Sequence, residues 1–303
     1  MEFGYSPPVG DRGAETIRPP EFVADLQRVL DVAAQGFGSF WVSDHLMFDA
    51  KYRLECWTEL AWIAGRYPGK KLGTLVLCNG FRNPALMAKM AASLQTLSGG
   101  RFILGYGAGW HAQEHEAYGF PFPAPAIRLA MLDEGVQVIR ALWTQAPANF
   151  AGQYYRVTGV YCEPRPAPPP PLMIGGSGER HTLRLVARYA DWWNDAARPP
   201  DIVRRKLAAL HDHCQAVGRP YDSIRKTLMV QVIIDRSQAA AVNRAGDRLA
   251  GDQPPVAGDP SAIRDRLTEY AELGISLCQI VFPNFPGTDD MRLFMDEVLP
   301  AFA

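Results

Sequence analysis

The stretch from Leu97 to Phe120 reads LSGGRFILGYGAGWHAQEHEAYGF and concentrates residues that could do chemistry. An apolar run leads into Gly105, Gly107 and Gly109, and histidines and glutamates follow at once. Glycines at the end of a strand let a ligand approach the backbone closely, although they also serve tight turns. Their spacing is not that of a dinucleotide-binding fingerprint. We therefore expect a strand end that faces a ligand.

His111 and His115 are four positions apart, so they would share one face of a helix. This is the spacing of the two histidines in HExxH zinc sites. Position 112 is Ala112, so the glutamate that acts as general base in such sites is missing, and no third ligand is evident. The alternative is a solvated first helical turn in which Glu114 and Glu116 favour the positive helix end. We predict no metal site from this pattern.

A second glycine cluster lies in GGSGERHTLRLVARYADWWN (175–194). An apolar strand ends in Gly175 and Gly176, Ser177 and Gly178 follow, and a helical pattern begins directly afterwards. Free backbone amides at a helix N-terminus, together with a hydroxyl, form an anion site, and phosphate is its usual ligand. The alternative is a simple capped turn. The pattern favours a phosphate site.

Asp44 and His45 end another apolar run. An imidazole changes charge near neutral pH, so His45 at the end of a strand is a candidate proton donor or acceptor. The alternative is a structural histidine. Asp44 is a candidate to orient His45 or to contact a coenzyme.

Short, continuous apolar runs recur along the chain and predict buried strands. These segments are 2–6, 37–45, 71–78, 101–107, 171–176, 190–195, 227–234 and 277–283. Helical patterns lie between them. Asn83 followed by Pro84 begins one helix, Asp259 followed by Pro260 begins another, and residues 127–143 repeat apolar side chains near every 3.6 positions.

The alternation of strand and helix predicts an α/β protein with one (β/α)8 TIM-barrel domain over residues 1–303. The alternative is an open doubly wound sheet, but no GxGxxG follows the first strand and the alternation continues to the C-terminus. Two segments interrupt the regular alternation of strand and helix. They are residues 146–171 and 235–259, and we predict that they are insertions after the fourth and seventh strands. Inserts after strands lie over the C-terminal mouth of a barrel, so we expect both segments there.

The composition narrows the class of protein. Hydrophobic residues make up 48% of the chain and the formal net charge is −1, with no basic stripe, so we expect no nucleic-acid partner. No signal-like start and no run of bilayer length is visible, so we expect no membrane partner. The 5 cysteines are scattered without a CxxC pair, which favours reduced thiols and a cytoplasmic location.

With these residues in place, the chain resembles the luciferase-like flavin and deazaflavin oxidoreductases, and most of all the subgroup that uses coenzyme F420. The resemblance covers nearly the whole chain. It rests on four stretches: GFGSFWVSDH (36–45), RNPALMAKMAASLQTLSGGRFILGYGAGWHAQEHEAYGFPFP (82–123), EGVQVIRALW (134–143) and IGGSGERHTLRLVARYADWWN (174–194).

The resemblance implies a (β/α)8 barrel with an insertion and a coenzyme ring at the C-terminal mouth. It implies a non-proline cis peptide in the third strand, at Leu75–Val76 by position. The residues that it implies for coenzyme binding are Leu75, Val76, Gly107, Ala108, Gly109 and Gln113 around the ring, and Gly175, Gly176, Ser177 and Gly178 at the phosphate. The glycines between positions 105 and 109 would then leave room for a flat ring.

Two positions depart from the family pattern. Sugar-phosphate dehydrogenases of this family have a glutamate directly after the glycine loop, where this chain has Trp110, so we do not expect that reaction. Relatives often have glycine where this chain has Trp192. We expect Trp110 and Trp193 in the wall of a substrate pocket, with Trp41 as a further aromatic candidate, and an apolar or planar substrate.

The resemblance thus implies an oxidoreductase that transfers a hydride between F420 and an organic small molecule, with His45 as the catalytic acid or base. The first alternative is a monooxygenase of the same family that uses reduced FMN. The second is a non-catalytic paralogue that binds the coenzyme, which an occluded mouth around Trp110 and Trp192 would favour. The family also implies a homodimer.

Overall fold

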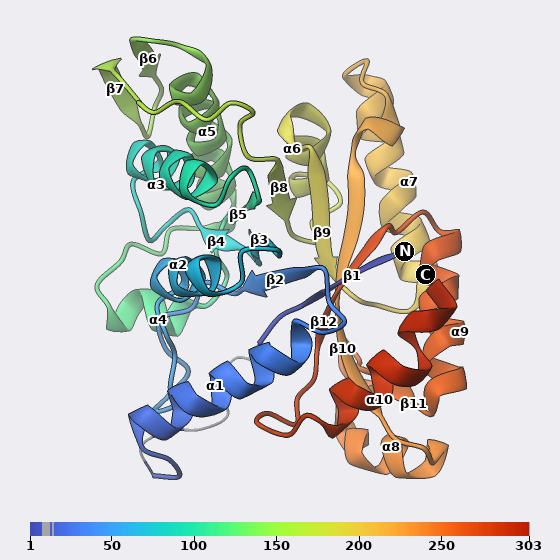
Figure 1. Cartoon of the computed structure of the whole chain (residues 1–303). Helices are drawn as coiled ribbons and strands as arrows, with labels where there is room; N and C mark the ends of the chain where they lie inside the picture. The colour runs from blue at the N-terminus through green and yellow to red at the C-terminus, as the bar shows by residue number, and fades with distance from the viewer. Residues whose placement is uncertain (8–12, 14, 303) are drawn as a thin grey trace.

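The computed structural model describes residues 1–7, 13 and 15–302. Its main sheet closes into a parallel barrel, because each barrel strand pairs with the next along the chain and the last pairs with the first (Figure 1). The barrel strands are β1 (Glu2–Tyr5), β2 (Ser39–Val42), β3 (Lys71–Thr74), β5 (Phe102–Gly107), β8 (Leu172–Gly175), β9 (Trp192–Ala196), β10 (Arg225–Ile234) and β12 (Leu277–Val281). The predicted TIM barrel is confirmed, and each predicted strand segment overlaps one of these strands.

Helices surround the barrel (Figure 1). They are α1 (Pro19–Ala33), α2 (Cys56–Arg66), α3 (Pro84–Leu97), α4 (Ala112–Ala117), α5 (Pro125–Thr144), α6 (Thr182–Tyr189), α7 (Pro200–Ala216), α8 (Gln238–Ala245), α9 (Pro260–Glu272) and α10 (Asp289–Glu297). Three short 3-10 turns are η1 (Tyr221–Ser223), η2 (Gly246–Ala250) and η3 (Leu299–Phe302). Among the described residues, no helix is both long and apolar enough to span a bilayer.

The predicted helix starts at Asn83 and Asp259 are confirmed by their capping bonds. The Asn83 side chain accepts a hydrogen bond from the Ala85 amide at 2.9 Å, and the Asp259 side chain accepts one from the Ala262 amide at 3.0 Å. A proline follows each cap, where its missing N–H costs no helical hydrogen bond. Local sequence therefore determines where α3 and α9 begin.

The third predicted strand is interrupted in the structure. It consists of β3 and a short strand β4 (Leu77–Cys78), and the intervening Leu75–Val76 peptide bond is cis, as the family resemblance implies. After the interruption β4 pairs with the end of β5, at Leu77 with Tyr106 and Cys78 with Gly107. This brings the backbone around Val76 to the C-terminal end of β5.

Side chains fill the barrel interior. Trp41 is fully buried and packs with Ile103, Met173 and Leu277, which come from three other barrel strands. Two glycines make room for its indole: a Cβ on Gly73 would lie 2.1 Å from the Trp41 ring, and one on Gly4 would lie 2.4 Å from it. Trp41 therefore closes the barrel core, and it is not an accessible pocket wall.

The two predicted insertions lie in different places. Residues 146–171 form a hairpin of β6 (Ala148–Ala151) and β7 (Arg156–Val160), which follows α5 instead of leaving a strand end. The Glu134 carboxylate on α5 accepts hydrogen bonds from the amides of residues 153, 154 and 155, and Gln95 of α3 donates to Pro168. The expectation that this segment lies over the mouth is corrected: it packs along α3 and α5 on the outside of the barrel (Figure 1).

The second insertion follows the seventh barrel strand, as predicted. Residues 235–259 contain α8, η2 and a short strand β11 (Val256–Gly258). β11 pairs in parallel with the C-terminal end of β10, at residues 232–234, beyond the part of β10 that pairs with β12. This segment therefore extends from the C-terminal end of the barrel.

Candidate functional site

The C-terminal ends of β4, β5 and β8 meet at one point of the barrel mouth. A Cβ added to Gly107 would lie 2.8 Å from a methyl group of Val76, and one added to Gly175 would also lie 2.8 Å from it. Only glycine therefore allows the Val76 side chain to pack directly on both backbones. The structure brings together three of the predicted coenzyme residues that are far apart in sequence, in a glycine-lined cradle (Val76, Gly107 and Gly175).

The backbone next to this cradle is equally close-packed. Gly109 has a φ of 77°, and a Cβ there would lie 2.5 Å from the Cys78 sulfur. Ala108, between the two glycines, is partly buried and packs on the core. The glycines at the end of β5 are thus required by the close approach of neighbouring backbones and side chains.

The turn after β8 leaves amide groups available a few residues before α6 begins at Thr182. Gly176 adopts a φ of 131°, and its own amide donates to the Asn194 carbonyl at 3.0 Å. In the described part of the chain, the amides of Ser177 and Gly178 have no hydrogen-bond partner. Unpaired amides at a helix N-terminus favour an anion. These residues can hold a phosphate group.

Two side chains hold this turn in place through hydrogen bonds to its carbonyl groups. The Lys206 ammonium group donates to the Ser177 carbonyl at 2.6 Å, and the Trp193 indole N–H donates to the Gly176 carbonyl at 3.1 Å. Lys206 is buried and lies 3.8 Å from Asp195. Burial lowers the pKa of Lys206, and Asp195 opposes that shift. A positive charge therefore lies directly behind the candidate phosphate turn.

His45 is held by a glutamate that comes from a distant part of the chain. The His45 Nδ1 atom lies 2.9 Å from Oε1 of Glu114 on α4, and Oε2 of Glu114 accepts the Leu46 amide at 2.8 Å. Glu114 is 2% exposed and His45 is 13% exposed. A carboxylate can only accept, so we assign the proton to Nδ1 of a neutral His45, which leaves Nε2 as an acceptor. The pair is a candidate proton-transfer dyad.

Aromatic rings surround the dyad. The ring centres of Phe48 and Trp110 lie 4.6 Å and 5.5 Å from that of His45, and Phe48 also stacks on His111 at 4.8 Å. Burial lowers the pKa of His45 below its ordinary value, while the hydrogen bond and charge of Glu114 oppose this shift. The lowered pKa favours the neutral form of His45, which is the form that can accept a proton.

Asp44 has a different role from the one expected. Its carboxylate receives two hydrogen bonds from the Arg82 guanidinium, at 2.7 and 3.0 Å, and a third from the Cys78 amide at 2.8 Å. The side chain is completely buried. The prediction that Asp44 contacts a coenzyme or orients His45 is corrected, because its oxygens connect the end of β2 to β4 and to the loop before α3 instead.

The two histidines with HExxH spacing do not form a pair of ligands. His115 is buried, with Nδ1 2.9 Å from the His111 carbonyl and Nε2 3.5 Å from the Cys78 sulfur. His111 instead faces Glu114, at 3.6 Å. Gln113 is exposed on α4, and its place beside the ring stays a prediction.

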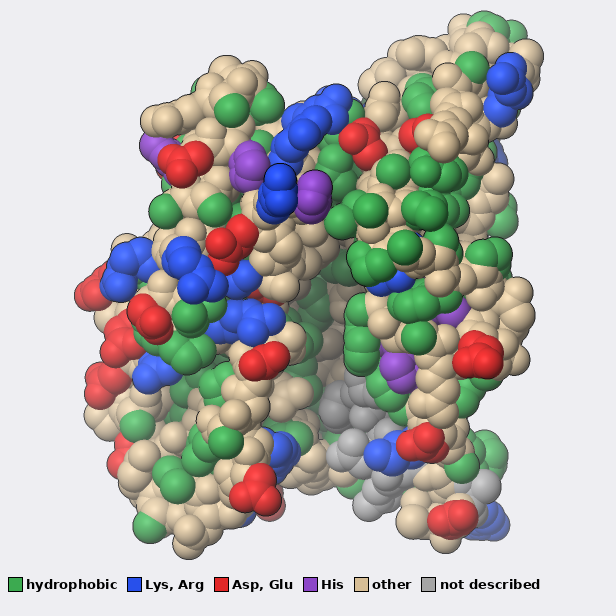
Figure 2. Space-filling model, turned by 180° about the vertical axis from the view of Figure 1, so that it is seen from behind, with side chains coloured by type: hydrophobic (Ala, Val, Ile, Leu, Met, Phe, Trp, Pro, Cys, Tyr) green, Lys and Arg blue, Asp and Glu red, His purple; other side chains and the backbone are tan. Residues whose placement is uncertain are grey.

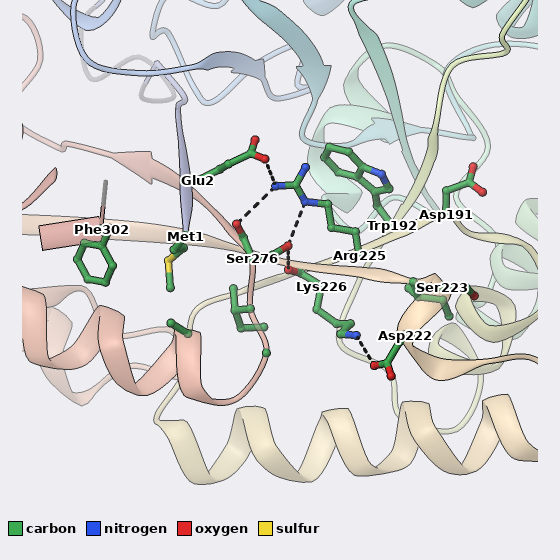
Figure 3. Close-up of a pocket in the computed structure, with 14 residues that line it drawn as sticks. Met1, Glu2, Asp191, Trp192, Asp222, Ser223, Arg225, Lys226, Ser276 and Phe302 are labelled. Carbon is green, nitrogen blue, oxygen red and sulfur yellow. Dashed lines mark hydrogen bonds and ion pairs between the residues drawn. The ribbon is translucent and has the colours of Figure 1, made fainter. Parts of the chain in front are cut away.

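The tryptophans expected in the pocket separate into three locations. Trp110 is 67% exposed next to His45, which keeps it a candidate for the pocket wall. Trp193 is fully buried and belongs to the core outside the barrel, so its prediction as a pocket residue is corrected. Trp192 lies at the start of β9, beside Arg225 at the opposite end of the barrel from the mouth (Figure 3). It cannot occlude the mouth.

The molecule is hollowed on the face opposite to that of Figure 1. Figure 2 shows a recess near the centre of this face, with hydrophobic side chains along its walls. Histidine side chains lie on both sides of the recess, and basic side chains gather above it (Figure 2). A recess of this kind suits a ligand with an apolar body and polar ends.

Sequence reasoning missed Glu114 as a partner of His45 and assigned it only to a solvated helical turn. Its position three residues after His111 was the one local signal, since i and i+3 side chains are neighbours on a helix. The contact with His45 joins residues that are 69 positions apart. No local pattern indicates such a contact.

Comparisons with known proteins identify relatives of this chain. The model of the luciferase-like monooxygenase family matches residues 1–254. The F420-dependent glucose-6-phosphate dehydrogenase of Amycolatopsis mediterranei (strain U-32) is 30% identical over 99% of this chain and 98% of that protein. The F420-dependent hydroxymycolic acid dehydrogenase of Mycobacterium tuberculosis (strain ATCC 25618 / H37Rv) is 34% identical over 77% of this chain and 64% of that protein.

Among solved structures, an F420-dependent secondary alcohol dehydrogenase in complex with an F420–acetone adduct has the same fold. Its TM-score is 0.83 at 20% identity, and the match covers 100% of this chain and 99% of that one. A monooxygenase from Streptomyces bottropensis also reaches 0.83, at 21% identity over 100% of both chains.

Proposed function

The chain belongs to the luciferase-like monooxygenase family, and on this premise we propose that it is an oxidoreductase that transfers a hydride between coenzyme F420 and an organic small molecule. The names of its relatives support the choice of coenzyme, since the dehydrogenases from Amycolatopsis and Mycobacterium both depend on F420. The alternative is a monooxygenase that uses reduced FMN, and coenzyme affinity distinguishes the two.

The observation that carries the proposal is the glycine-lined cradle at the ends of β4, β5 and β8. A side chain at Gly107 or Gly175 would collide with Val76. Val76 therefore packs flush against both backbones, and the three residues together would form a flat surface on which a planar ring could lie. Leu75, Val76, Gly107, Ala108 and Gly109 would hold the ring of the coenzyme.

The turn after β8 supports the other end of the coenzyme. Within the described residues, the amides of Ser177 and Gly178 are free to donate to a phosphate in the turn between β8 and α6. Lys206 behind the turn adds a positive charge and fixes the Ser177 carbonyl at 2.6 Å. The proposed ring site and the proposed phosphate site are thus adjacent in sequence: Gly175 ends β8, and Ser177 lies in the turn that follows.

The protein contributes position and proton transfer to the reaction. When bound, F420 supplies the hydride acceptor or donor. Glu114 holds the Nδ1 proton of His45, so Nε2 accepts the hydroxyl proton as an alcohol is oxidised, and returns it in the reverse reaction. Phe48 and Trp110 cover the imidazole and limit the access of water.

The surroundings of the dyad also support a class of substrate. Trp110 presents an exposed indole beside His45, and Phe48 lies on another side of the imidazole. We therefore propose an apolar or planar alcohol, or the matching ketone, in preference to a sugar phosphate.

We also propose a cytoplasmic location. All 5 cysteines are free and buried, which supports it.

Coenzyme binding measured side by side tests the proposal. The protein would be titrated with F420 and, separately, with FMN, and we expect F420 to bind at least roughly tenfold more tightly. Tighter binding of FMN would contradict the proposal and favour the monooxygenase. A panel of alcohols and ketones would then be screened for F420 reduction or oxidation, and tight F420 binding without any turnover would favour a non-catalytic protein.

A further inference from the structure

We propose that His45, His111 and Glu114 form a binding site for a divalent transition-metal ion, with Zn²⁺ as the best fit. The three side chains come from the end of β2 and from α4 with the residue before it. Their candidate ligand atoms all lie within 4.8 Å of one another. Two imidazoles and a carboxylate are a ligand set that zinc accepts, with a fourth position open.

The separations of these atoms suit a tetrahedral ion. His45 Nδ1 lies 2.9 Å from Glu114 Oε1, and His111 Nδ1 lies 3.6 Å from the same oxygen. Zinc binds nitrogen and oxygen at about 2.0–2.2 Å, so two of its ligand atoms lie roughly 3.3–3.6 Å apart. These two distances bracket this range and the third pair of atoms lies within 4.8 Å, so side-chain rotations would bring the three atoms around one ion.

An unsatisfied nitrogen points to the same position. The Nδ1 atom of His111 is buried and has no hydrogen-bond partner among the described residues. A buried polar atom without a partner costs free energy, which a metal bond would offset. Its nearest charged neighbour is the Glu114 oxygen that His45 shares, at 3.6 Å. The unpaired Nδ1 atom of His111 therefore lies on the side of the ring that is near the other two proposed ligands.

The ligands are already held in position by other groups. Oε2 of Glu114 accepts the Leu46 amide at 2.8 Å, which leaves Oε1 directed between the two imidazoles. Phe48 stacks on the His111 ring at an interplanar angle of 24° and restricts its rotation. Such supporting contacts orient ligands in metal sites.

Metal binding has a chemical consequence that rests on the proposed function. Zn²⁺ on Nδ1 of His45 would displace the proton that Glu114 now holds, and a neutral imidazole carries one proton, which would then be on Nε2. Nε2 could no longer accept a proton from an alcohol. Zn²⁺ would therefore inhibit alcohol oxidation by fixing the wrong tautomer of His45.

Calorimetric titration of the coenzyme-free chain with ZnCl₂ tests the site without any reference to catalysis. We expect one ion per chain, and binding at least roughly tenfold weaker in His111→Ala and in Glu114→Gln. Glu114→Gln keeps an acceptor for the Leu46 amide, and circular dichroism would verify folding of each variant. His211→Ala is the matched control, since His211 is an exposed histidine on α7, and it should bind zinc like the wild type.

Equal affinity in the wild type, His111→Ala and Glu114→Gln would overturn the proposal, as would the lack of saturable binding to the wild type. Inhibition would be measured relative to each variant's own rate, with release by a chelator, and His111→Ala should resist it. Binding of F420 is measured without zinc, so failure of the metal site and failure of the proposed function would give different results.

Discussion

The Nδ1 atom of His45 lies 2.9 Å from Oε1 of Glu114, although 69 positions separate the two residues in the chain. The carboxylate determines the tautomer of the imidazole and partly restores the pKa that burial lowers. This relationship converts a buried histidine into a base with a defined free nitrogen. It predicts distinct effects for substitutions of the two residues.

Replacement of His45 by asparagine should abolish most of the proton transfer. General acid–base catalysis contributes typically 10²–10⁴-fold, so we expect kcat for alcohol oxidation to fall by about that factor. Coenzyme affinity should stay within a few-fold, because the cradle and the phosphate turn lie on other strands. Steady-state kinetics and a coenzyme titration check both expectations, and an unchanged kcat would make His45 a structural residue.

Replacement of Glu114 by glutamine should move the pH dependence of the reaction. The base must be neutral, so kcat/KM for oxidation falls as pH drops through the pKa of His45. Glu114 raises this pKa against the effect of burial, and glutamine removes that charge. The acidic limb of the profile should therefore shift to lower pH. Glu116→Gln, an exposed neighbour on α4, is the control, and a shift toward higher pH in Glu114→Gln would refute the dyad.

Replacement of Ser177 by aspartate should weaken coenzyme binding at the phosphate turn. A carboxylate there would repel the phosphate that the free amides of residues 177 and 178 are expected to hold. We expect at least roughly tenfold weaker binding, about 1.4 kcal/mol. Gly176 is a poorer test position, because its φ of 131° makes any side chain strained.

Two comparisons make this result specific. Ser177→Ala removes only a hydroxyl group and should cost about 0.5–1.5 kcal/mol of binding free energy at most. A deazaflavin riboside without the phosphate should bind Ser177→Asp and wild type alike. Equal losses for the riboside and the full coenzyme would mean that the turn does not hold the phosphate.

Replacement of Gly73 by alanine should destabilise the barrel. The added Cβ would lie 2.1 Å from the Trp41 ring, in a core that has no free space to receive it. Overpacking of this kind typically costs about 1–3 kcal/mol in the free energy of unfolding. Urea denaturation measures the change.

Gly65→Ala provides the matched control for the barrel glycine. Gly65 lies in α2, and a Cβ there would meet nothing within 4 Å. Alanine is the better helix former by roughly 0.5–1 kcal/mol, so this variant should equal or exceed the wild type in stability. If both variants unfold at the same urea concentration, Trp41 does not depend on Gly73 for its space.

Much of the fold was predictable because it depends on local features. Buried parallel strands read as short apolar runs, and Asn83 and Asp259 begin helices through bonds to amides two or three residues away. The glycines at positions 107 and 175 were identified for a similar reason, since a strand end without side chains is visible in the sequence itself. The segment 146–171 was misplaced because its position depends on contacts with Gln95 and Glu134, which lie outside it.

The sequence by itself thus determined the order of strands and helices, the barrel they form, and the glycine-rich strand ends at its mouth. Only the tertiary structure decided which side chains face one another there. Adjacent residues of a strand point to opposite faces, so Trp192 packs on the barrel interior while Trp193 lies in the outer core. Asp44 pairs with Arg82 and His45 with Glu114 because barrel closure brings the end of β2, the loop before α3, and α4 together. Apolar periodicity does not predict such pairings, because it indicates which face of a helix or strand is buried but not which distant residue packs against that face.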